Sequence, residues 1–489
     1  MKTPKRVVVI GNGMAGARAV RELRRRDPAI AITVLGAERC APYNRILLTD
    51  VLAGQIDEDD IFDRPADQRG ATVHTGVSAV RIDRERQEVI TGDGGTHPYD
   101  SLVLATGSTS TIPDIPGLRL DDGTLVRGAV GFRTLEDCHG ILRGAHRGSR
   151  ALVLGGGLLG LEAARALAGR GVQVTVLHPT DTVMNRQLSR QAADMLTGQL
   201  AELGVAVRRG AVVSRVRAGF HTGTGEERMT GVELTDGTVV PADLLIVACG
   251  VTPETGLAAA AGLTVGEGVA VDASMRTSDS AIYAIGDCTQ LSGRVSRLVD
   301  DAWSQAKTAA DAITGTLTSA PAPVVPVTRL KADDIDLTLI GACHPQDSTD
   351  GSFEVLTDTD PDSGRYQRIV LSRGRILGAT ILGDHPDTGV LTQACRDRRV
   401  LTPHELARLA RLPGPRGDLA PDSPDIGQDS PVCYCRNVPK SRILESWSSG
   451  ARTVSAIART TRATTGCGIC RTAVKQLLKT ASAEPGGTT

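Results

Sequence analysis

Continuous apolar runs, rather than alternating ones, mark the first three hundred residues of the chain. The runs are rich in Val, Ile and Leu, and most end in glycine or are followed directly by it; the clearest are residues 7–10, 32–35, 101–107, 151–154, 172–177 and 243–250. Runs of this kind are typical of strands that are buried on both faces of a parallel sheet. Helical patterns follow two of them, at residues 15–26 and 161–168. The predicted fold class is therefore α/β.

A glycine-rich turn joins the first predicted strand to the first predicted helix. Gly11, Gly13 and Gly16 form the pattern G-x-G-x-x-G, with Met14 and Ala15 between the last two glycines. The first glycine permits a tight turn, the second lets the backbone approach a pyrophosphate, and the third lets helix and strand pack closely. The free N–H groups of the helix then favour phosphates. We expect a dinucleotide site here, although a plain glycine turn is the alternative for an isolated motif.

The same arrangement occurs a second time, about 140 residues later. Another strand, glycine turn and helix follow one another from residue 151, and residues 71–100 and 205–240 each resemble an antiparallel meander. Such an internal repeat predicts two Rossmann-like nucleotide-binding units. The expected binding residues of the second turn are Gly155, Gly157, Leu158, Leu159 and Gly160.

Two charged residues follow the second strand of the first unit. Glu38 lies where an acid would hydrogen-bond the ribose of an adenine dinucleotide, and a solvated loop acid is the alternative. Arg45 could pair with a pyrophosphate or the edge of a flavin, against the alternative of a surface arginine.

Further candidates lie at strand ends, where small residues let the backbone approach a flat ring. Asp287 could accept a hydrogen bond from a ribitol hydroxyl, and a helix that starts at residues 303–306 could face flavin carbonyls with its N–H groups. The other expected contacts of this kind are Ala79, Thr106, Gly107 and Gly250.

The second unit carries no clear sign of cofactor preference. His178 ends its second strand, where an acid would favour NAD and arginines would favour NADP; a packing or surface role is its default interpretation. Glu162 could orient a nicotinamide, and a helix-surface acid is the alternative.

Less chemistry is visible between the repeat and the C-terminal region. Residues 319–329 are rich in Pro and Val and predict a linker. Residues 330–382 alternate like strands, residues 390–410 look like one helix, and residues 413–431 predict a second, flexible linker. Packing or docking is the expected role of this region.

Four cysteines near the C-terminus carry the strongest chemical signal. Cys433 and Cys435 form a C-x-C pair, Cys467 and Cys470 form a C-x-x-C pair, and two helices are predicted between them, at residues 440–448 and 454–459. Four thiolates can hold zinc or a [2Fe–2S] cluster. The C-x-C spacing favours the cluster over zinc, and a dithiol at the second pair is a third possibility. Cys40 could be a redox nucleophile, but an inert thiol is favoured for it and for the remaining cysteines.

Composition limits the classes of partner. The chain has 489 residues, 55 Lys and Arg against 56 Asp and Glu, and 2% aromatic residues. The balanced charge predicts no nucleic-acid partner. The absence of a long apolar run predicts no membrane span, and a core strand within six residues of the start leaves no room for a signal peptide, so a cytoplasmic location is expected.

The motifs together resemble a known family. The two glycine turns, residues 42–49, the Ala-Thr-Gly of residues 105–107 and the Ile-Gly-Asp-Cys of residues 285–288 resemble FAD- and NAD(P)-dependent pyridine nucleotide oxidoreductases. With the cysteine set, the order of parts resembles the electron-donating region of assimilatory nitrate and nitrite reductases, which ends in a bacterioferritin-associated-ferredoxin-like [2Fe–2S] domain.

This resemblance implies a discontinuous, glutathione-reductase-like FAD domain (residues 1–115 and 246–318) and an NAD(P)-binding domain (116–245). It further implies a small α+β interface domain (325–411), a linker (412–431) and a small helical [2Fe–2S] domain (432–478). The implied cofactors are FAD, NAD(P)H and a [2Fe–2S] cluster.

The resemblance implies that electrons pass from NAD(P)H through FAD and the cluster to a partner reductase. A molybdenum nitrate reductase is the expected partner, with a sirohaem nitrite reductase or another ferredoxin-type acceptor as alternatives. The flavin half lacks a redox-active cysteine pair, which argues against disulfide reduction. The sirohaem ligand cysteines are missing too, so the chain itself is not expected to reduce nitrite.

Hydride transfer needs no general acid or base, so no catalytic residue is assigned. The 413–431 linker could let the cluster domain swing between flavin and partner. A different class of function stays open at this point: a zinc-containing module that senses nucleotide redox state.

Overall fold

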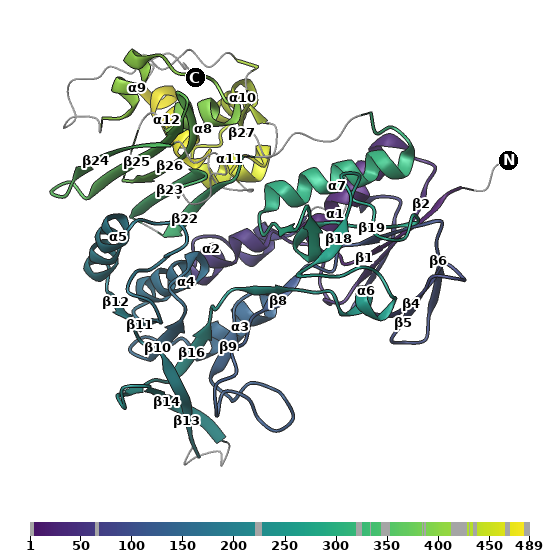
Figure 1. The fold of residues 1–489 in the computed structure, drawn as a ribbon, viewed down its shortest axis with the longest axis horizontal. Helices are drawn as coiled ribbons and strands as arrows, with labels where there is room; N and C mark the ends of the chain where they lie inside the picture. The colour runs from purple at the N-terminus through teal and green to yellow at the C-terminus, as the bar shows by residue number, and fades with distance from the viewer. Residues whose placement is uncertain are drawn as a thin grey trace. The chain divides into compact units, whose positions relative to one another are not determined.

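The computed structural model describes residues 4–63, 68–220, 227–318, 325–332, 334–343, 353–383, 385, 388–411, 428–429, 431–433, 438–464 and 470–483. The chain divides into two compact units (Figure 1). Unit 1 comprises Met1–Arg45, Glu58–Thr109 and Val251–Val324; unit 2 comprises Ile46–Asp57, Ser110–Gly250 and Val325–Thr489. Among the described residues, none of the helices combines the length and the hydrophobicity that a membrane crossing requires.

Unit 1 is built on a five-stranded parallel sheet with the order β19-β7-β1-β2-β3. Its strands are β1 (Arg6–Ile10), β2 (Ala31–Gly36), β3 (Thr72–Thr75), β7 (Ser101–Leu104) and β19 (Ile282–Ala284). In the register of this sheet, Val9 is opposite Val34 on one side and Val103 on the other. The predicted strands at residues 7–10 and 32–35 are confirmed.

Both faces of this sheet are covered, which explains why its strands are continuously apolar. Val7 and Val9 pack with helices α1 (Met14–Arg26) and α7 (Val299–Thr314). Val8 and Ile10 point to the opposite face, where they pack with α6 (Gly256–Ala260) and a meander. The meander consists of β4 (Ala79–Asp83), β5 (Glu88–Thr91) and β6 (Thr96–Pro98).

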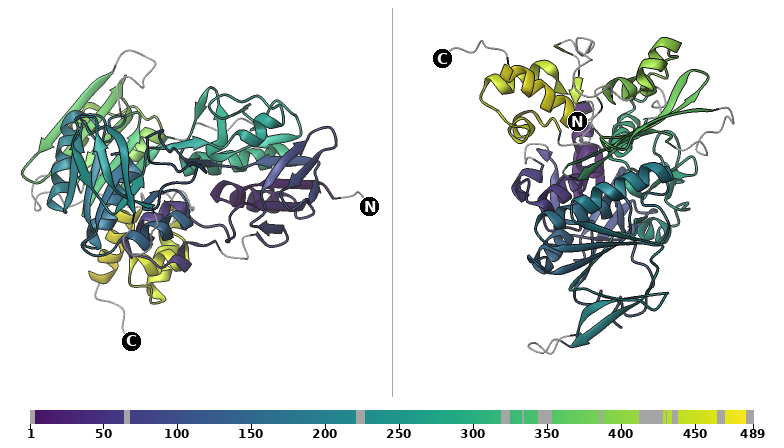
Figure 2. Two further views of the ribbon diagram at one scale, coloured as in Figure 1. Left: turned by 90° about the horizontal axis from the view of Figure 1, so that it is seen from below. Right: turned by 90° about the vertical axis from the view of Figure 1, so that its left-hand side faces the viewer.

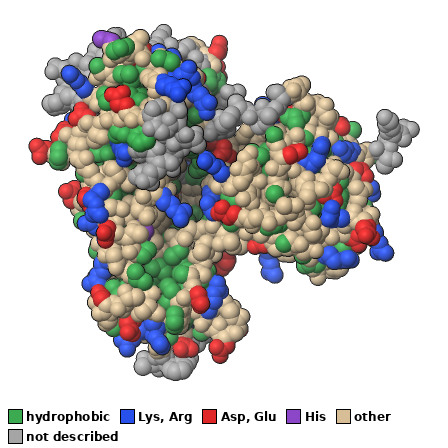
Figure 3. Space-filling model, in the orientation of Figure 1, with side chains coloured by type: hydrophobic (Ala, Val, Ile, Leu, Met, Phe, Trp, Pro, Cys, Tyr) green, Lys and Arg blue, Asp and Glu red, His purple; other side chains and the backbone are tan. Residues whose placement is uncertain are grey.

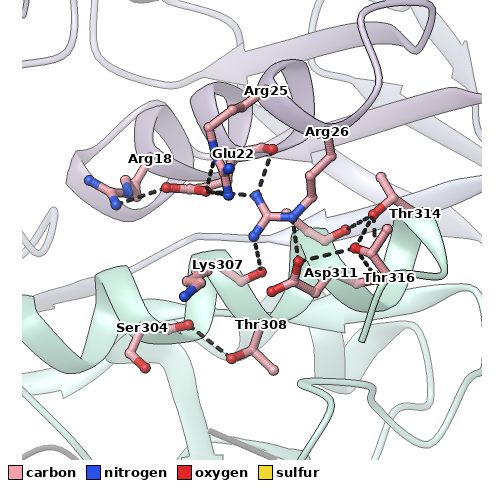
Figure 4. A network of polar contacts seen from close by, with 11 residues as sticks. Arg18, Glu22, Arg25, Arg26, Ser304, Lys307, Thr308, Asp311, Thr314 and Thr316 are labelled. Carbon is pink, nitrogen blue, oxygen red and sulfur yellow. Dashed lines mark hydrogen bonds and ion pairs between the residues drawn. The ribbon is translucent and has the colours of Figure 1, made fainter. Parts of the chain in front are cut away.

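A polar network joins α1 to α7 along their shared edge (Figure 4). Glu22 is 7% exposed and accepts hydrogen bonds from Arg26, which also pairs with Asp311 of α7. Arg18 pairs with the other oxygen of Glu22 at 2.8 Å. The Arg18 guanidinium lies 5.9 Å from the ring centroid of Trp303. Because these charges are partly buried and paired, the network fixes the two helices side by side.

Unit 2 begins its nucleotide-binding part with a second five-stranded parallel sheet, of order β12-β11-β10-β16-β9. Its strands are β9 (Ala129–Gly131), β10 (Arg150–Leu154), β11 (Gln173–His178), β12 (Val205–Arg209) and β16 (Leu244–Val247). Leu152 and Leu154 pack toward a meander of β13 (Val213–Phe220), β14 (Glu227–Leu234) and β15 (Val239–Pro241). The helices of this part are α2 (Leu48–Ala53), α3 (Leu135–Gly144), α4 (Leu158–Gly169) and α5 (Arg190–Glu202).

The two predicted meanders are each one strand too long. Residues 72–75 and 205–209 do not belong to them; they are β3 and β12, the outer strands of the two parallel sheets. The strand pattern is the same in both settings, because an edge strand of a parallel sheet is also half exposed. The helix expected from residue 303 begins four residues earlier, at Val299, with Asp300 and Asp301 in its first turn.

An antiparallel sheet of order β22-β23-β26-β25-β24 follows in unit 2. Its strands are β22 (Val327–Ala332), β23 (Ile335–Gly341), β24 (Glu354–Asp360), β25 (Arg365–Ser372) and β26 (Arg375–Leu382). The predicted linker at 319–329 therefore extends three residues too far.

Two helices, not the single one expected at residues 390–410, pack on this sheet. They are α8 (Thr388–Arg396) and α9 (Pro403–Leu409). Thr402 and Glu405 form a capping box with Pro403 at the first helical position, so a new helix begins there. The Thr-Pro-x-Glu signal is visible in the sequence but is masked by the continuous helical periodicity.

The C-terminal part of unit 2 is a small group of short helices, drawn in yellow in Figure 2. It contains β27 (Pro431–Cys433), β28 (Val438–Pro439), α10 (Lys440–Ser448), α11 (Val454–Thr461) and α12 (Arg471–Ala483). The two helices predicted between the cysteine pairs are confirmed. The short remaining strands are β8 (Ser108–Ser110), β17 (Val251–Pro253), β18 (Val269–Val271), β20 (Thr289–Leu291) and β21 (Arg294–Val295). The predicted fold class, with two Rossmann-like sheets, an α+β part and a small helical domain, is confirmed.

Candidate cofactor sites

The first glycine turn leaves no room for side chains at two of its three glycines. A Cβ on Gly11 would lie 2.1 Å from the carbonyl oxygen of Ala105, and Gly11 has a φ of +104°. A Cβ on Gly16 would lie 2.0 Å from the carbonyl oxygen of Gly11. Gly13 faces open space instead, with only the Arg45 guanidinium within 4 Å of a Cβ placed there. The turn is therefore closed toward the sheet and open toward a ligand.

The N-terminus of α1 is prepared for an anion. Met14 and Ala15 begin the helix, its cap Gly13 offers no side chain, and the first turn contains no acidic residue. Asn12, inside the turn, buries its Nδ2 without a hydrogen-bond partner among the described residues, while its Oδ1 accepts a bond from Gln68. A buried amide donor beside free helix N–H groups fits the phosphate part of a dinucleotide.

Glu38 and Arg45 lie together beyond the end of β2. They form an ion pair, and the Tyr43 hydroxyl donates to the other carboxylate oxygen of Glu38 at 2.7 Å. The Arg45 guanidinium also lies 5.1 Å from the centroid of the Tyr43 ring. Tyr43 was not singled out in the sequence, although it stands two residues before Arg45. The ribose and pyrophosphate roles of Glu38 and Arg45 stay predictions.

Asp287 lies near the start of α1. Gly286, with a φ of +81°, would place a Cβ 3.0 Å from that of Ala15, and its N–H donates to Gln305 of α7. Asp287 itself accepts a hydrogen bond of 2.9 Å from Ser108. Ser108 and Gln305 hold this end of the sheet together, and no sequence motif marked them.

Three further expected contacts of unit 1 are positioned by the same sheet. Thr106 donates its hydroxyl hydrogen to the Glu254 carbonyl at 2.7 Å, and the Gly107 carbonyl accepts from the Glu254 N–H. Ala79 begins β4 and packs against the core on the meander face. Their contacts with a cofactor stay predictions.

The second glycine turn repeats the geometry of the first. A Cβ on Gly155 would lie 2.4 Å from the Ala248 carbonyl oxygen, and one on Gly160 would lie 2.0 Å from the Gly155 carbonyl oxygen. Gly157 would have nothing within 4 Å of a Cβ. Leu158 and Leu159 begin α4, which again has no side-chain cap and no acid in its first turn. The turn fits a second dinucleotide phosphate for the same reasons.

His178 turns toward the glycine loop from the end of β11. The Gly156 N–H donates to its Nδ1 at 3.1 Å, so the neutral ring carries its hydrogen on Nε2, which lies 2.9 Å from the Thr180 hydroxyl. Burial lowers the pKa of the His178 imidazole below its usual value. His178 therefore supports the loop as an acceptor; a contact with the cofactor stays a prediction.

Glu162 and Gly250 complete the expected set of unit 2. Glu162 is only 6% exposed, so the alternative of a helix-surface acid is wrong. Its expected contact with a nicotinamide stays a prediction. Gly250 has a φ of +97°, and its carbonyl accepts the Thr111 N–H.

Two of the four C-terminal cysteines fall within the described residues. Cys433 and Cys470 are 0% and 5% exposed and belong to one hydrophobic core with Ile443, Ile457 and Val474. The Thr464 N–H donates to the Cys470 sulfur at 3.2 Å, and α12 begins at the next residue. An N–H···S bond and a helix N-terminus both stabilise a thiolate, as cluster ligation requires. Cys435 and Cys467 lie outside the described residues, as does most of the predicted 413–431 linker.

Cys40 has the surroundings of an unreactive thiol. It is half-buried, and burial together with the nearby Glu38 carboxylate raises its pKa. A raised pKa keeps the thiol protonated and a poor nucleophile, which supports the inert interpretation.

Comparisons with known families agree with this division of the chain. The model of the pyridine nucleotide-disulphide oxidoreductases matches residues 5–312. The model of the C-terminal domain of rubredoxin NAD+ reductase matches residues 326–398. The model of the BFD-like [2Fe-2S] binding domain matches residues 431–480.

Two curated relatives cover almost the whole chain. The assimilatory nitrate reductase electron transfer subunit of Bacillus subtilis (strain 168) is 32% identical over 97% of this chain and 59% of its own length. The nitrite reductase (NADH) large subunit of Escherichia coli (strain K12) is 30% identical over 98% of this chain and 56% of its own length. The chain thus spans between half and three fifths of these relatives.

Solved structures share the fold of about four fifths of the chain. The covalent complex of putidaredoxin reductase and putidaredoxin superposes with a TM-score of 0.74 and 27% identity, covering 82% of this chain and 95% of that chain. An NAD-dependent persulfide reductase from A. fulgidus superposes with a TM-score of 0.71 and 28% identity, covering 82% and 78% of the two chains. With the two glycine turns and the buried cysteines, these findings make FAD, NAD(P)H and a [2Fe–2S] cluster the cofactors. The chain belongs to the pyridine nucleotide-disulphide oxidoreductase family, as an NAD(P)H-dependent oxidoreductase with a C-terminal BFD-like [2Fe–2S] domain.

Proposed function

We propose that this chain delivers electrons from NAD(P)H to a partner reductase, and that the partner is an assimilatory nitrate reductase. The observation that carries the proposal is the presence, in one chain, of two nucleotide turns and a BFD-like domain whose thiols Cys433 and Cys470 share one buried core. The likeness to an electron transfer subunit over 97% of the chain supports the choice of partner.

In this proposal each of three parts of the chain binds one cofactor. Unit 1 holds FAD at the Gly11 turn with Glu38 and Arg45, and residues 110–250 hold NAD(P)H at the Gly155 turn. The C-terminal helices hold the cluster with Cys433, Cys435, Cys467 and Cys470. Bound FAD would supply the conversion of a two-electron donor into the one-electron transfers that an iron–sulfur centre requires. The chain's own residues bind, orient and shield the cofactors, and none is proposed as a proton donor. The predicted cytoplasmic location belongs to this proposal.

A second candidate is the electron-donating part of a nitrite reductase system. Its support is that nitrite reductases match with similar identity and coverage, between 30% and 32% over 97–98% of the chain. Reconstitution separates the two: NADH-driven turnover should appear with a molybdenum nitrate reductase, and turnover with only a sirohaem nitrite reductase would select the second candidate.

The internal electron route is tested by anaerobic NADH titration of the purified protein, followed by absorbance and EPR. We expect the flavin band to bleach and a reduced [2Fe–2S] signal to appear, with about two iron atoms per chain. Cys470→Ser should abolish the EPR signal and leave flavin bleaching intact, whereas the control Cys343→Ser should behave like the wild type. Zinc in place of iron, or iron that stays oxidised while the flavin bleaches, would contradict the proposal.

A further inference from the structure

The charge of the chain is distributed unevenly, which the whole-chain balance conceals. Residues 431–489 contain nine Lys and Arg but two Asp and Glu, a net charge of +7. The whole chain has a net charge of −1, and the difference between −1 and +7 leaves −8 on the preceding residues. The cluster domain is therefore a basic module attached to an acidic protein.

The positive side chains lie on the surface of all three helices. Arg442 on α10, Arg459 on α11, and Lys475 and Lys479 on α12 are exposed. Glu445 is the one acid among residues 438–464 and 470–483. On the face shown in Figure 3, by contrast, Lys and Arg side chains are interspersed with Asp and Glu. We call Arg442, Arg459, Lys475 and Lys479 the basic surface.

Part of the basic surface borders a hollow between α10 and α11. Arg442 and Arg459 line this hollow of about 530 Å³, together with Glu445, Ser446 and Thr460. The hydroxyl groups of Ser446 and Thr460 contact each other, which joins the two helices. Guanidinium groups such as those of Arg442 and Arg459 suit carboxylate side chains.

The other part follows α12. Lys475 and Lys479 are four residues apart and therefore share one face of the helix. Val474 and Leu478, which adjoin them, are buried in the domain core with Cys470. The lysines thus lie on the outside of the same helix whose first turn adjoins a cluster ligand.

We propose that the basic surface docks the cluster domain against an acidic face of the protein that accepts its electrons. The inference rests on the proposed function and adds the chemistry of the partner. Cys433 and Cys470 are buried, so an acceptor must lie against this domain to receive an electron. Opposite charges accelerate such an encounter and orient the two proteins, and salt weakens the effect.

The test uses the full-length holoenzyme and two one-electron acceptors of opposite charge. The probes are an acidic rubredoxin and the basic cytochrome c, each reduced with NADH as donor. For rubredoxin, kcat/KM should fall about tenfold between about 50 and about 300 mM NaCl, because salt screens the attraction. For cytochrome c, it should rise or stay unchanged.

Charge reversal locates the effect. Arg442→Glu with Arg459→Glu, and separately Lys475→Glu with Lys479→Glu, should each lower kcat/KM for rubredoxin about tenfold at low salt and flatten its salt dependence. The control pair Arg215→Glu with Arg217→Glu changes the net charge equally at exposed positions of β13 and should have little effect.

Each outcome separates docking from the proposed electron route. NADH should still reduce the cluster in every variant, as seen by EPR. If the cluster is not reduced even in the wild type, the proposed function fails. If it is reduced but both acceptors respond alike to salt and to charge reversal, the docking proposal is overturned. It is also overturned if the variants slow reduction of the cluster itself, because the basic surface would then contact another part of the chain. Competition between duplex DNA and rubredoxin would overturn it too, because the surface would then bind nucleic acid.

Discussion

The two nucleotide-binding sheets agree in four of their five strands, yet different side chains follow the second strand of each. Four strands follow the same order in both sheets, β3-β2-β1-β7 and β12-β11-β10-β16, and both sheets carry a three-stranded meander on one face. The outer strand beside the fourth differs: β19 follows the other strands of its sheet in the chain, whereas β9 precedes them. The first residue of the first strand pairs with an aspartate before the fourth strand in each: Arg6 with Asp100, and Arg150 with Asp243. The glycine contacts agree within 0.3 Å, at 2.1 and 2.4 Å for the first glycine and 2.0 Å for both third glycines.

The difference begins directly after the second strand. In unit 1, Glu38 is paired with Arg45 and Tyr43, and the Arg45 guanidinium faces Gly13. In unit 2, His178 is buried and neutral and supports the loop through the Gly156 N–H, while Gly157 faces open space. The Glu38–Arg45 ion pair beside the first turn suits a cofactor that stays bound. The open space at Gly157 suits a ligand that must leave after each turnover. We therefore expect the backbone scaffold to set where a dinucleotide binds and a few side chains to set how firmly it is held.

The largest effect is expected where the shared scaffold is broken. Gly11→Ala should remove FAD and lower the free energy of unfolding by about 3 kcal/mol, because the methyl group meets the Ala105 carbonyl at a positive φ. The control Gly94→Ala also has a positive φ, +86°, but nothing within 4 Å, and should cost about 1 kcal/mol. Flavin absorbance per chain and chemical denaturation measure both. Equal losses would show that backbone strain, not the close approach, determines the effect.

Gly157→Ala should change only the binding of NAD(P)H. Its Cβ has open space, so the melting temperature and the FAD content should stay unchanged, while the KM for NAD(P)H rises about tenfold because a pyrophosphate can no longer approach the backbone. Gly198→Ala on α5 also adds a methyl group in open space and should leave KM unchanged. A KM that stays at the wild-type value in Gly157→Ala would argue against this turn as the nicotinamide nucleotide site.

Glu38→Gln removes the charged partner of Arg45 but keeps the side-chain shape. We expect FAD to dissociate about fivefold faster, a loss of about 1 kcal/mol, reduced from a buried pair because Glu38 is 37% exposed. Flavin fluorescence in dilute urea follows the release. Glu85→Gln, at an exposed position of the meander, is the matched control. If both variants retain FAD like the wild type, the Glu38–Arg45 ion pair has no part in FAD retention.

The acceptor role of His178 predicts a pH dependence confined to the second site. Its pKa is lowered below 6.5 in the folded chain, so the unfolded chain binds the proton more readily, and stability and NAD(P)H affinity should fall as the pH decreases below 6.5. His178→Asn keeps an acceptor for the Gly156 N–H without titrating, and should flatten this dependence between about pH 7 and pH 5. Thermal melting and nucleotide titration measure it. A dependence that survives in His178→Asn must arise from another group.

The smallest effects are expected at the surface ion pairs that occupy equivalent positions of the two sheets. Asp100→Asn and Asp243→Asn each remove an ion pair whose partner is about half exposed, so the melting temperature should change by no more than ~2 °C. The two variants should agree, because the pairs occupy equivalent positions. A larger loss in one of them would show that the two scaffolds are less equivalent than their geometry suggests.

The sequence by itself determined the local architecture of both turns. Close backbone approaches exclude a side chain at Gly11, Gly16, Gly155 and Gly160, whereas Gly13 and Gly157 leave open space beside each turn. The spacing of these glycines was sufficient to predict strand, turn and helix. The continuous apolar strands followed from burial on both faces, and the C-x-C and C-x-x-C pairs identified the cluster domain. These features are local, and their physical cause lies within about twenty residues of chain.

The tertiary structure decided what depended on distant neighbours. Whether residues 72–75 and 205–209 join a meander or a parallel sheet depends on which strand edge is free, and their own pattern suits both. His178 became an internal acceptor, Glu162 became buried and Arg45 paired with Glu38 because packing brought each beside a partner or a core that composition does not specify. The basic surface was likewise not evident from the balanced charge of the whole chain, because only folding brings the charged side chains of three helices together on one small domain. Local backbone sterics can be read from a sequence, but the partner of a polar side chain is fixed only when the chain has closed around it.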